Sequence, residues 1–188
     1  MRCGAGARRK FIVAVSPLAC YNLREVKREP AGIGKESIFM DRCALAYQYH
    51  REGWNCAQSV AGACADLAGK TPEEILPLLG GFGGGFGGSH EEACGAISGG
   101  VLILSLCFPF AQSADQAAKR ELYRVTKEFR RRFFDVFGFS RCGDLLRARP
   151  GVTEKTPAAR RLGVEKHCDN MIVTAVELLE KLVEEERG

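Results

Sequence analysis

Apolar residues after Met40 recur every three or four positions, which is the spacing of one face of an α-helix. The pattern predicts helices over residues 41–51, 56–67 and 169–186, and a long amphipathic helix over residues 113–137. The apolar face of the long helix holds Leu122, Val125, Phe129, Phe133 and Phe137. No stretch alternates apolar and polar residues as a half-buried strand does, and no segment repeats. The predicted fold class is therefore all-α.

Polar residues mark the starts of several helices. Asn55 followed by Gln58 has the pattern of a capping box, in which each side chain bonds the backbone N–H of the other residue. The Thr-Pro-Glu-Glu run at residues 71–74 opens a short helix, because Thr is a favoured N-cap and Pro fits the first helical position. The pattern of residues 89–92 predicts another capping box, which would open an apolar helix running to Phe108.

Two loops separate these helices. Seven of the nine residues from 80 to 88 are glycine, and the other two are Phe82 and Phe86. No regular element tolerates this glycine density, so we expect a hinge or a close backbone contact. Phosphate binding is disfavoured, because the loop lacks the Lys-Ser/Thr pair of a P-loop and no strand precedes it. Residues 148–163 are basic and broken by Pro and Gly, and are predicted as the second loop.

Residues 93–111 contain no charged side chain, and Gly95 and Gly99 have the spacing of a close helix crossing. A membrane span is disfavoured, because three glycines, two serines and Pro109 interrupt the run and no basic residue flanks it closely. We predict instead a central helix that is buried on all sides and crossed closely at its glycines. The architecture is then a compact multi-helix bundle with a glycine-rich loop before this buried helix.

The formal net charge of +4 belongs to the beginning of the chain. Residues 1–36 hold eight Lys and Arg against three Asp and Glu, so the remaining 152 residues carry −1. A nucleic-acid-binding surface needs clustered positive charge, and we therefore expect no nucleic acid as a partner. The three arginines at residues 130–132 are interpreted as a solvated helix face.

Residues 1–39 differ in character from the rest. Arg8 and Arg9, followed by Lys-Phe and a short apolar run, are similar to a twin-arginine export signal. The apolar run ends at Pro17, however, and no convincing cleavage site follows it. The predicted location is the cytoplasm, with export through the twin-arginine-like signal as the alternative.

A different hypothesis places the true start of the protein at Met40. The residues at 34–36, Gly-Lys-Glu, can be encoded by a purine-rich bacterial ribosome-binding sequence at a suitable distance from Met40. We interpret residues 1–39 as a leader, a disordered extension or an untranslated segment. Residues 40–188 are predicted to form a single helical domain.

Nine cysteines are about twice the usual frequency for this length, and the odd number prevents complete pairing within one chain. This fits a reducing compartment with a few reactive thiols better than a disulfide framework. Cys56, Cys142 and Cys168 lie at or near predicted helix starts, where the helix dipole lowers the pKa of a thiol. Cys94 follows two acids, which oppose its ionisation.

The remaining cysteines are assigned simpler roles. Cys43, Cys64 and Cys107 occupy apolar positions within helices and are predicted to be inert core residues. Cys3 and Cys20 belong to residues 1–39.

Several motifs together resemble the C-GCAxxG-C-C family of redox-active proteins. They are WNCAQSV from Trp54, GFGGG from Gly81, CGAISG from Cys94, and the later cysteines at 142 and 168. The resemblance covers about residues 41–180. It implies a helical domain, genes for oxidoreductases or transporters nearby, and relatives in which selenocysteine replaces a cysteine, which favours thiol redox chemistry over structural zinc. The four characteristic cysteines that it implies are Cys56, Cys94, Cys142 and Cys168.

Three functions stay open for these cysteines. In the first, the protein exchanges thiols and disulfides, with Cys56 as the attacking thiol and a second cysteine such as Cys94 resolving the intermediate. In the second, all four cysteines ligate an iron–sulfur cluster or another metal. Gly83, Gly84 and Gly85 would then admit the cofactor or donate N–H groups to its sulfurs. In the third, the thiols are incidental to a non-catalytic helical module.

Two histidines are candidate auxiliary ligands or proton donors, His90 and His167. The expected partner is a redox protein or a small thiol or disulfide, whether the chain is an oxidoreductase or an accessory electron carrier. The oligomeric state stays open.

Overall fold

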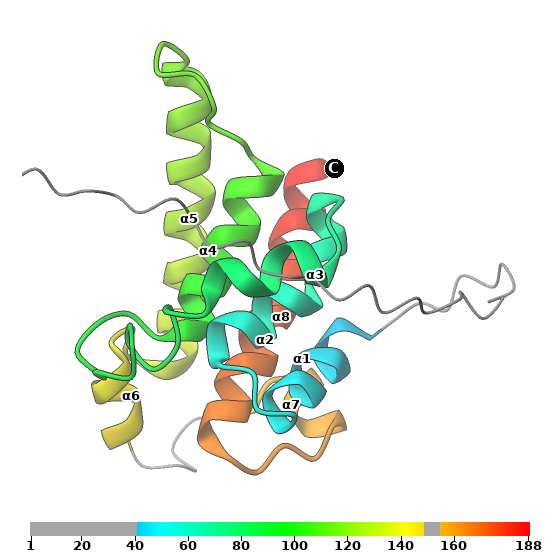
Figure 1. Cartoon of the computed structure of the whole chain (residues 1–188), viewed down its shortest axis with the longest axis vertical. Coiled ribbons are helices and arrows are strands. Elements are labelled where there is room, and N and C mark those ends of the chain that lie inside the picture. Colours follow the sequence, from blue (N-terminus) through cyan, green and yellow to red (C-terminus); the bar gives the residue numbers. More distant parts are fainter. Residues whose placement is uncertain (1–40, 149–154) are drawn as a thin grey trace, which may run out of the picture. The chain divides into compact units, whose positions relative to one another are not determined.

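The structure is a computed structural model that describes residues 41–148 and 155–188. The predictions of a leader, an export signal or a later start concern residues 1–39 and lie outside these described residues. Within the two described ranges the chain forms eight α-helices, two 3-10 turns and no β-strand (Figure 1). The all-α prediction is confirmed.

The helices agree closely with the predicted ranges, and one helix is added. The predicted helix over residues 56–67 divides into an α-helix and a 3-10 turn, and a short helix forms inside the loop predicted over residues 148–163. The α-helices are α1 (Arg42–Arg51), α2 (Cys56–Ala63), α3 (Pro72–Ile75), α4 (Gly95–Cys107), α5 (Gln116–Phe137), α6 (Cys142–Arg147), α7 (Pro157–Arg161) and α8 (His167–Arg187). The 3-10 turns are Ala65–Ala68 and Leu76–Leu79.

Capping explains where α2 begins. Asn55 Oδ1 accepts hydrogen bonds from the backbone N–H groups of Ala57 at 2.9 Å and Gln58 at 3.0 Å. In return Gln58 Oε1 accepts the N–H of Asn55 at 3.3 Å, which completes the predicted capping box. These bonds satisfy N–H groups that a helix start otherwise leaves without partners.

The capping box predicted at residues 89–92 is wrong, and α4 begins later, at Gly95. The reason is a long-range backbone pairing. Residues 90–94 lie against residues 140–143, with an antiparallel bridge between Ala93 and Arg141. The N–H of Cys94 donates to Ser140 O at 2.9 Å, and the N–H groups of residues 142 and 143 donate to residues 92 and 90. This pairing holds the segment outside the helix, and Cys94 becomes the N-cap of α4.

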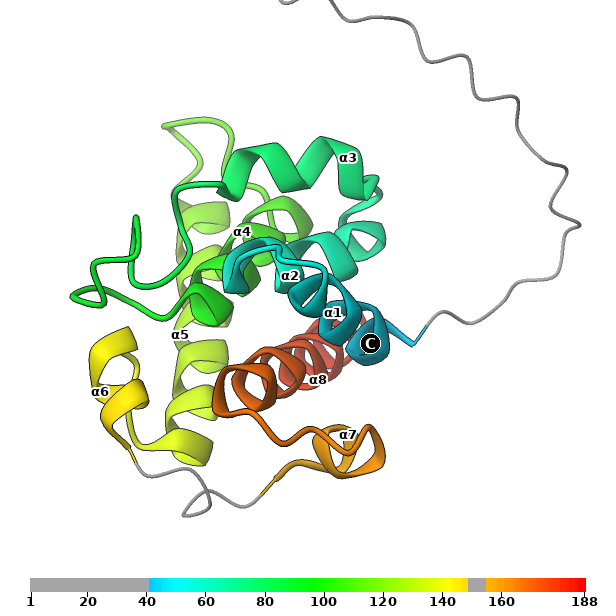
Figure 2. The same ribbon diagram turned by 60° about the horizontal axis from the view of Figure 1, so that its bottom comes forward.

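The first half of the last helix, α8, is enclosed by other helices. Every residue from 169 to 177 is buried, and α1, α4, α5 and α7 pack around the helix (Figure 2). The long helix α5 buries Val125, Phe129, Phe133 and Phe137, while Leu122 is partly buried against the core. The predicted inward face of this helix is therefore confirmed.

The glycines of α4 allow two helices to cross it closely. A Cβ atom on Gly99 would lie 2.4 Å from the carbonyl oxygen of Ala57 in α2, and one on Gly100 would lie 2.4 Å from Phe129 Cε1 in α5. The predicted close crossing of a buried helix is confirmed. No helix in the described ranges has the length and apolar character required to span a bilayer.

The crossing at Gly99 makes a prediction for stability. The Gly99→Ala variant should lose about 1–3 kcal/mol of unfolding free energy, because its methyl group would meet a backbone carbonyl that cannot move without shifting α2. Urea unfolding followed by circular dichroism measures the change. The matched control is Gly80→Ala, because Gly80 is exposed and has no atom within 4 Å of an added Cβ. Equal losses in both variants would contradict the crossing.

Candidate thiol site

Four cysteines from distant parts of the chain lie at helix starts. Cys56 and Cys142 are the first residues of α2 and α6, Cys168 is the second residue of α8, and Cys94 is the N-cap of α4. In every pair of these four thiols, the charge of one raises the pKa of the other. The fold thus gathers the four predicted cysteines in one neighbourhood, where the positive ends of helix dipoles favour negative charge.

Gly95 fits α4 against the first turn of α2. A Cβ atom at Gly95 would lie 3.0 Å from Cys56 Cβ and 3.0 Å from the backbone nitrogen of Ala57. Because glycine lacks that atom, the start of α4 approaches the start of α2 directly. This contact brings Cys94, the residue before Gly95, beside Cys56.

The glycine-rich loop, residues 80–88, covers the same helix start. Asn55 Nδ2 donates to the carbonyl oxygens of Leu79 and Gly80, both at 3.1 Å. A Cβ on Gly83 would lie 2.5 Å from Asn55 Cβ, so only glycine fits there. The close backbone contact predicted for this loop is confirmed. Asn55 therefore both starts α2 and fastens the loop over it.

The loop reaches two of the cysteines through consecutive residues. Gly84 and Gly85 have φ values of +59° and +68°, in the left-handed region that favours glycine. The N–H of Gly84 donates a hydrogen bond to the thiol of Cys56. A Cβ on Gly85 would lie 2.9 Å from Cys142 Cβ. Neighbouring residues of the loop thus contact Cys56 and Cys142, and both views place α6 next to the loop (Figures 1 and 2).

Cys56 has a lowered pKa. Burial raises the pKa of this thiol, but hydrogen bonds from His50 and from the backbone N–H of Gly84, together with the charge of His50, outweigh the burial. The pKa falls below its ordinary value of 9.0 as a result. The other six cysteines in the described ranges all have raised pKa values. Cys56 is therefore the most acidic thiol among them.

His50 is itself held by a buried carboxylate. Its Nδ1 contacts Asp169 Oδ1, whose side chain is only 4% exposed. Since Nδ1 contacts the carboxylate, Nε2 is the ring nitrogen available to Cys56. The hydrogen bond to Cys56 raises the pKa of His50, burial opposes this rise, and the hydrogen bond and charge of Asp169 support it. The order Asp169, His50, Cys56 is the arrangement in which an acid orients a histidine that activates a nucleophile.

Sequence reasoning missed His50 and Asp169. Asp169 is 119 residues from His50 and adjoins Cys168 at the start of α8, so no local pattern connects them. A local signal did exist for His50. Gly53 and Asn55 indicate that α1 ends and α2 begins within a few residues, and such a tight connection brings the last turn of α1 near the first turn of α2.

The expectation that Cys142 and Cys168 have lowered pKa values is wrong. Burial and the charge of Cys56 raise the pKa of Cys142, and the same causes with Cys142 and Asp169 raise that of Cys168 to about 11. Burial also raises the pKa of Cys94 to about 12, consistent with the expected opposition to ionisation. Their places at helix starts do not compensate for the loss of water around them.

Of the two histidines considered from the sequence, one contacts a site thiol. His90 Nδ1 lies 3.4 Å from Cys142 Sγ. His90 has a φ of +61°, an unusual conformation for a residue with a side chain. His167, in contrast, donates from Nε2 to the carbonyl oxygen of Leu145 at 2.7 Å. The structure thus uses His167 to attach α8 to α6.

The three cysteines predicted as core residues lie away from this chemistry. Cys43 and Cys64 are buried and Cys107 is half-buried, and burial raises the pKa of each. Cys107 Sγ also donates to Leu67 O at 3.4 Å. Their predicted places in the core are confirmed for Cys43 and Cys64, while Cys107 is only partly buried. Cys3 and Cys20 lie outside the described residues.

The thiol arrangement does not fit a metal ion. In the described part of the chain, no three or more His, Cys, Asp or Glu side chains are grouped so that they could hold one. The four cysteines are near enough to influence each other's charge, but they do not form such a group as arranged here. A cluster-binding role for the cysteines, with Gly83, Gly84 and Gly85 beside the cofactor, stays a prediction from the sequence.

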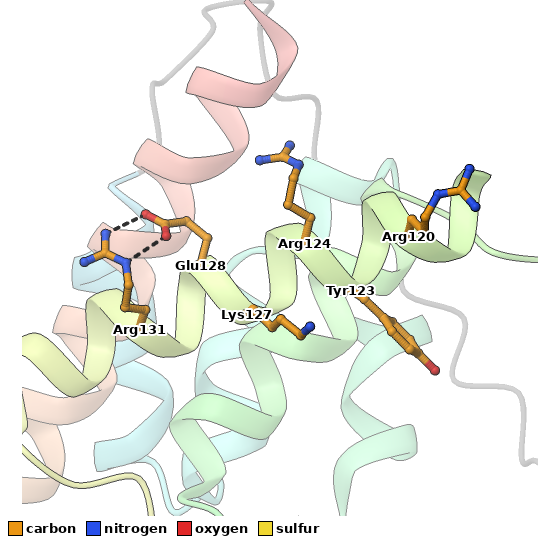
Figure 3. A pocket seen from close by; sticks show the side chains of 6 residues that line it. All are labelled: Arg120, Tyr123, Arg124, Lys127, Glu128 and Arg131. Atoms are coloured by element: carbon orange, nitrogen blue, oxygen red, sulfur yellow. Dashed lines mark hydrogen bonds and ion pairs between the residues drawn. The ribbon is translucent and has the colours of Figure 1, made fainter. Parts of the chain in front are cut away.

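A separate hollow lies on the exposed side of α5. Its lining side chains are Arg120, Tyr123, Arg124, Lys127, Glu128 and Arg131 (Figure 3). Arg131 pairs with Glu128 at 2.8 Å and with Asp135 at 2.6 Å. Arg132 is less exposed and pairs with Glu128 and Glu185. These are pairs along or beside a solvated helix face, as predicted for this arginine-rich stretch.

Comparison with known proteins gives a family match for the chain. The model of the family described as "Putative redox-active protein (C_GCAxxG_C_C)" matches residues 54–182, a range that contains Cys56, Cys94, Cys142 and Cys168. No curated protein matches the chain, and no solved structure does. Because the match covers more than half of the sequence, the chain belongs to the C-GCAxxG-C-C family of redox-active proteins.

Proposed function

We propose that this redox-active protein exchanges thiols and disulfides, with Cys56 as the attacking thiolate. The observation that carries the proposal is the chain of contacts from Asp169 through His50 to Cys56, which lowers the pKa of a thiol that burial alone would keep protonated. The thiolate is the nucleophilic form of cysteine, so the lowered pKa makes this sulfur more reactive at a given pH than an ordinary thiol.

The reaction begins with attack of the Cys56 thiolate on one sulfur of a substrate disulfide. A new S–S bond forms between Cys56 and that half of the substrate, and the substrate S–S bond breaks. The electron pair of the broken bond leaves on the second sulfur, which takes the proton held by the His50 imidazolium. Asp169 keeps the ring oriented throughout. The partner that supplies the disulfide is a protein or a small disulfide.

The pKa values of the other three site cysteines support Cys56 as the attacking thiol. A thiolate at Cys56 raises the pKa of Cys94, Cys142 and Cys168, so these three stay protonated while Cys56 is charged. One reactive thiolate surrounded by neutral thiols suits stepwise exchange, in which a second cysteine later displaces the substrate from Cys56.

The role of His50 makes a direct prediction. In His50→Gln the pKa of Cys56 should rise, because burial remains while the imidazolium is lost. At any pH below the pKa, each further unit of rise lowers the thiolate fraction about tenfold. Alkylation of Cys56 by iodoacetamide, followed by peptide mass spectrometry between pH 5 and pH 10, measures the change.

The matched control for this experiment is His167→Gln, because His167 bonds a backbone carbonyl and not a cysteine. Its Cys56 profile should equal that of the wild type, in which alkylation declines only as the pH falls through the lowered pKa. An unchanged profile in His50→Gln would contradict the assigned role.

Cys56→Ser tests the proposed function itself. The fully reduced variant should lose its rapid reaction with oxidised glutathione, because the activated sulfur is gone, while Cys43→Ser should react as the wild type does. Loss of free thiols with time is the readout. A Cys56→Ser variant that still reacts at the wild-type rate would overturn the proposal, and so would bound iron and acid-labile sulfide that disappear in this variant.

A further inference from the structure

Cys142 and His90 form a second thiol–imidazole pair that the attack by Cys56 does not use. The pair is fixed by backbone hydrogen bonds on both sides. The N–H of Gly143 donates to the carbonyl oxygen of His90 at 2.8 Å, and the N–H of His90 donates to Gly84 O at 2.9 Å. The N–H of Cys142 donates to Glu92 O at 2.8 Å. These bonds fix the backbone of both partners.

Two glycines allow this approach. A Cβ on Gly143 would lie 2.7 Å from the carbonyl oxygen of His90, and one on Gly85 would lie 3.0 Å from His90 Cα as well as against Cys142. Gly84, the neighbour of Gly85, donates its N–H to Cys56. The loop therefore holds the His90–Cys142 pair next to the residue that bonds the attacking thiol.

We propose that Cys142 is the resolving cysteine and that His90 accepts its proton. The inference rests on the proposed function of Cys56 and deepens it by naming the second sulfur and its base. Cys142 thus takes the resolving role for which the sequence suggested Cys94.

The surroundings of the other two candidates favour Cys142. In the described ranges the sulfur of Cys94 has no hydrogen bond to an imidazole. The same holds for Cys168, since the ring of the neighbouring His167 bonds Leu145. Of these three, Cys142 alone has a base in contact with its sulfur.

The charge of Cys56 sets the order of the two steps. Burial and the Cys56 thiolate both raise the pKa of Cys142. When Cys56 forms a mixed disulfide, its negative charge disappears and only burial still opposes ionisation of Cys142. The second thiol thus becomes easier to ionise once the first has reacted.

In the resolving step, neutral His90 carries its own proton on Nε2, and its Nδ1 takes the proton of Cys142. The Cys142 thiolate attacks Cys56 Sγ, an S–S bond forms between the two cysteines, and the bond from Cys56 to the substrate half breaks. That half leaves as a thiolate and is protonated by the solvent. The protein loses two electrons and the substrate disulfide is reduced to two thiols.

The test treats the reduced full chain with one equivalent of 5,5′-dithiobis(2-nitrobenzoate) without oxygen. In the wild type, attack by Cys56 releases one thionitrobenzoate and resolution releases a second. Mass spectrometry should then show a disulfide between Cys56 and Cys142. Cys142→Ser and Cys142→Ala should release one equivalent and retain the other on Cys56. Cys94→Ser and Cys168→Ser should still release both equivalents and form the disulfide between Cys56 and Cys142.

His90→Gln separates the role of the base from that of the fold. It should release the first thionitrobenzoate at the wild-type rate and the second at least about tenfold more slowly, because the proton acceptor is missing. An equal first rate also shows that each variant is folded around Cys56. Retention of the label in Cys94→Ser or Cys168→Ser, or full release in Cys142→Ser, would overturn the inference. A wild-type chain that carries no label or disulfide on Cys56 would instead overturn the proposed function.

Discussion

The hydrogen bond between His50 and Cys56 is the interaction on which the account of this protein depends. Cys56 is largely enclosed, and burial by itself disfavours a thiolate. The imidazole and the N–H of Gly84 reverse this preference, and Asp169, in the buried first half of α8, holds the ring in place. A buried charged pair is stable when each charge has a partner. Here the imidazole of His50 lies between the carboxylate of Asp169 and the thiol of Cys56, so each charge has one.

The remaining architecture brings four helix starts to that pair. Glycines at the start and middle of α4 remove the side chains that would separate it from α2. Asn55 caps α2 and fastens the glycine-rich loop with the same side chain. The loop in turn gives one N–H to Cys56 and leaves room for Cys142. Gly83, Gly84 and Gly85 are thus required by close approach, whereas a Cβ added to any of the other four loop glycines would meet nothing within 4 Å.

A feature of the fold or the site could be predicted from the sequence when the residues that cause it lie close together along the chain. The capping box at Asn55 and the apolar face of α5 involve residues within one or a few helical turns, and both were predicted correctly. The start of α4 was predicted wrongly, because residues 90–94 pair with a segment about fifty residues away. The thiol of Cys142 has a raised pKa because burial, which the sequence does not display, outweighs its helix start. His50 and Asp169 could not be paired from the sequence, because 119 residues separate them.

The most direct measurement of the central claim is the titration of each site thiol by NMR, with the cysteine Cβ carbons labelled and the chain fully reduced. The account predicts that Cys56 titrates below 9.0, while Cys94, Cys142 and Cys168 titrate above it. A midpoint for Cys56 at or above 9.0, or one for another site cysteine below that of Cys56, would contradict the account.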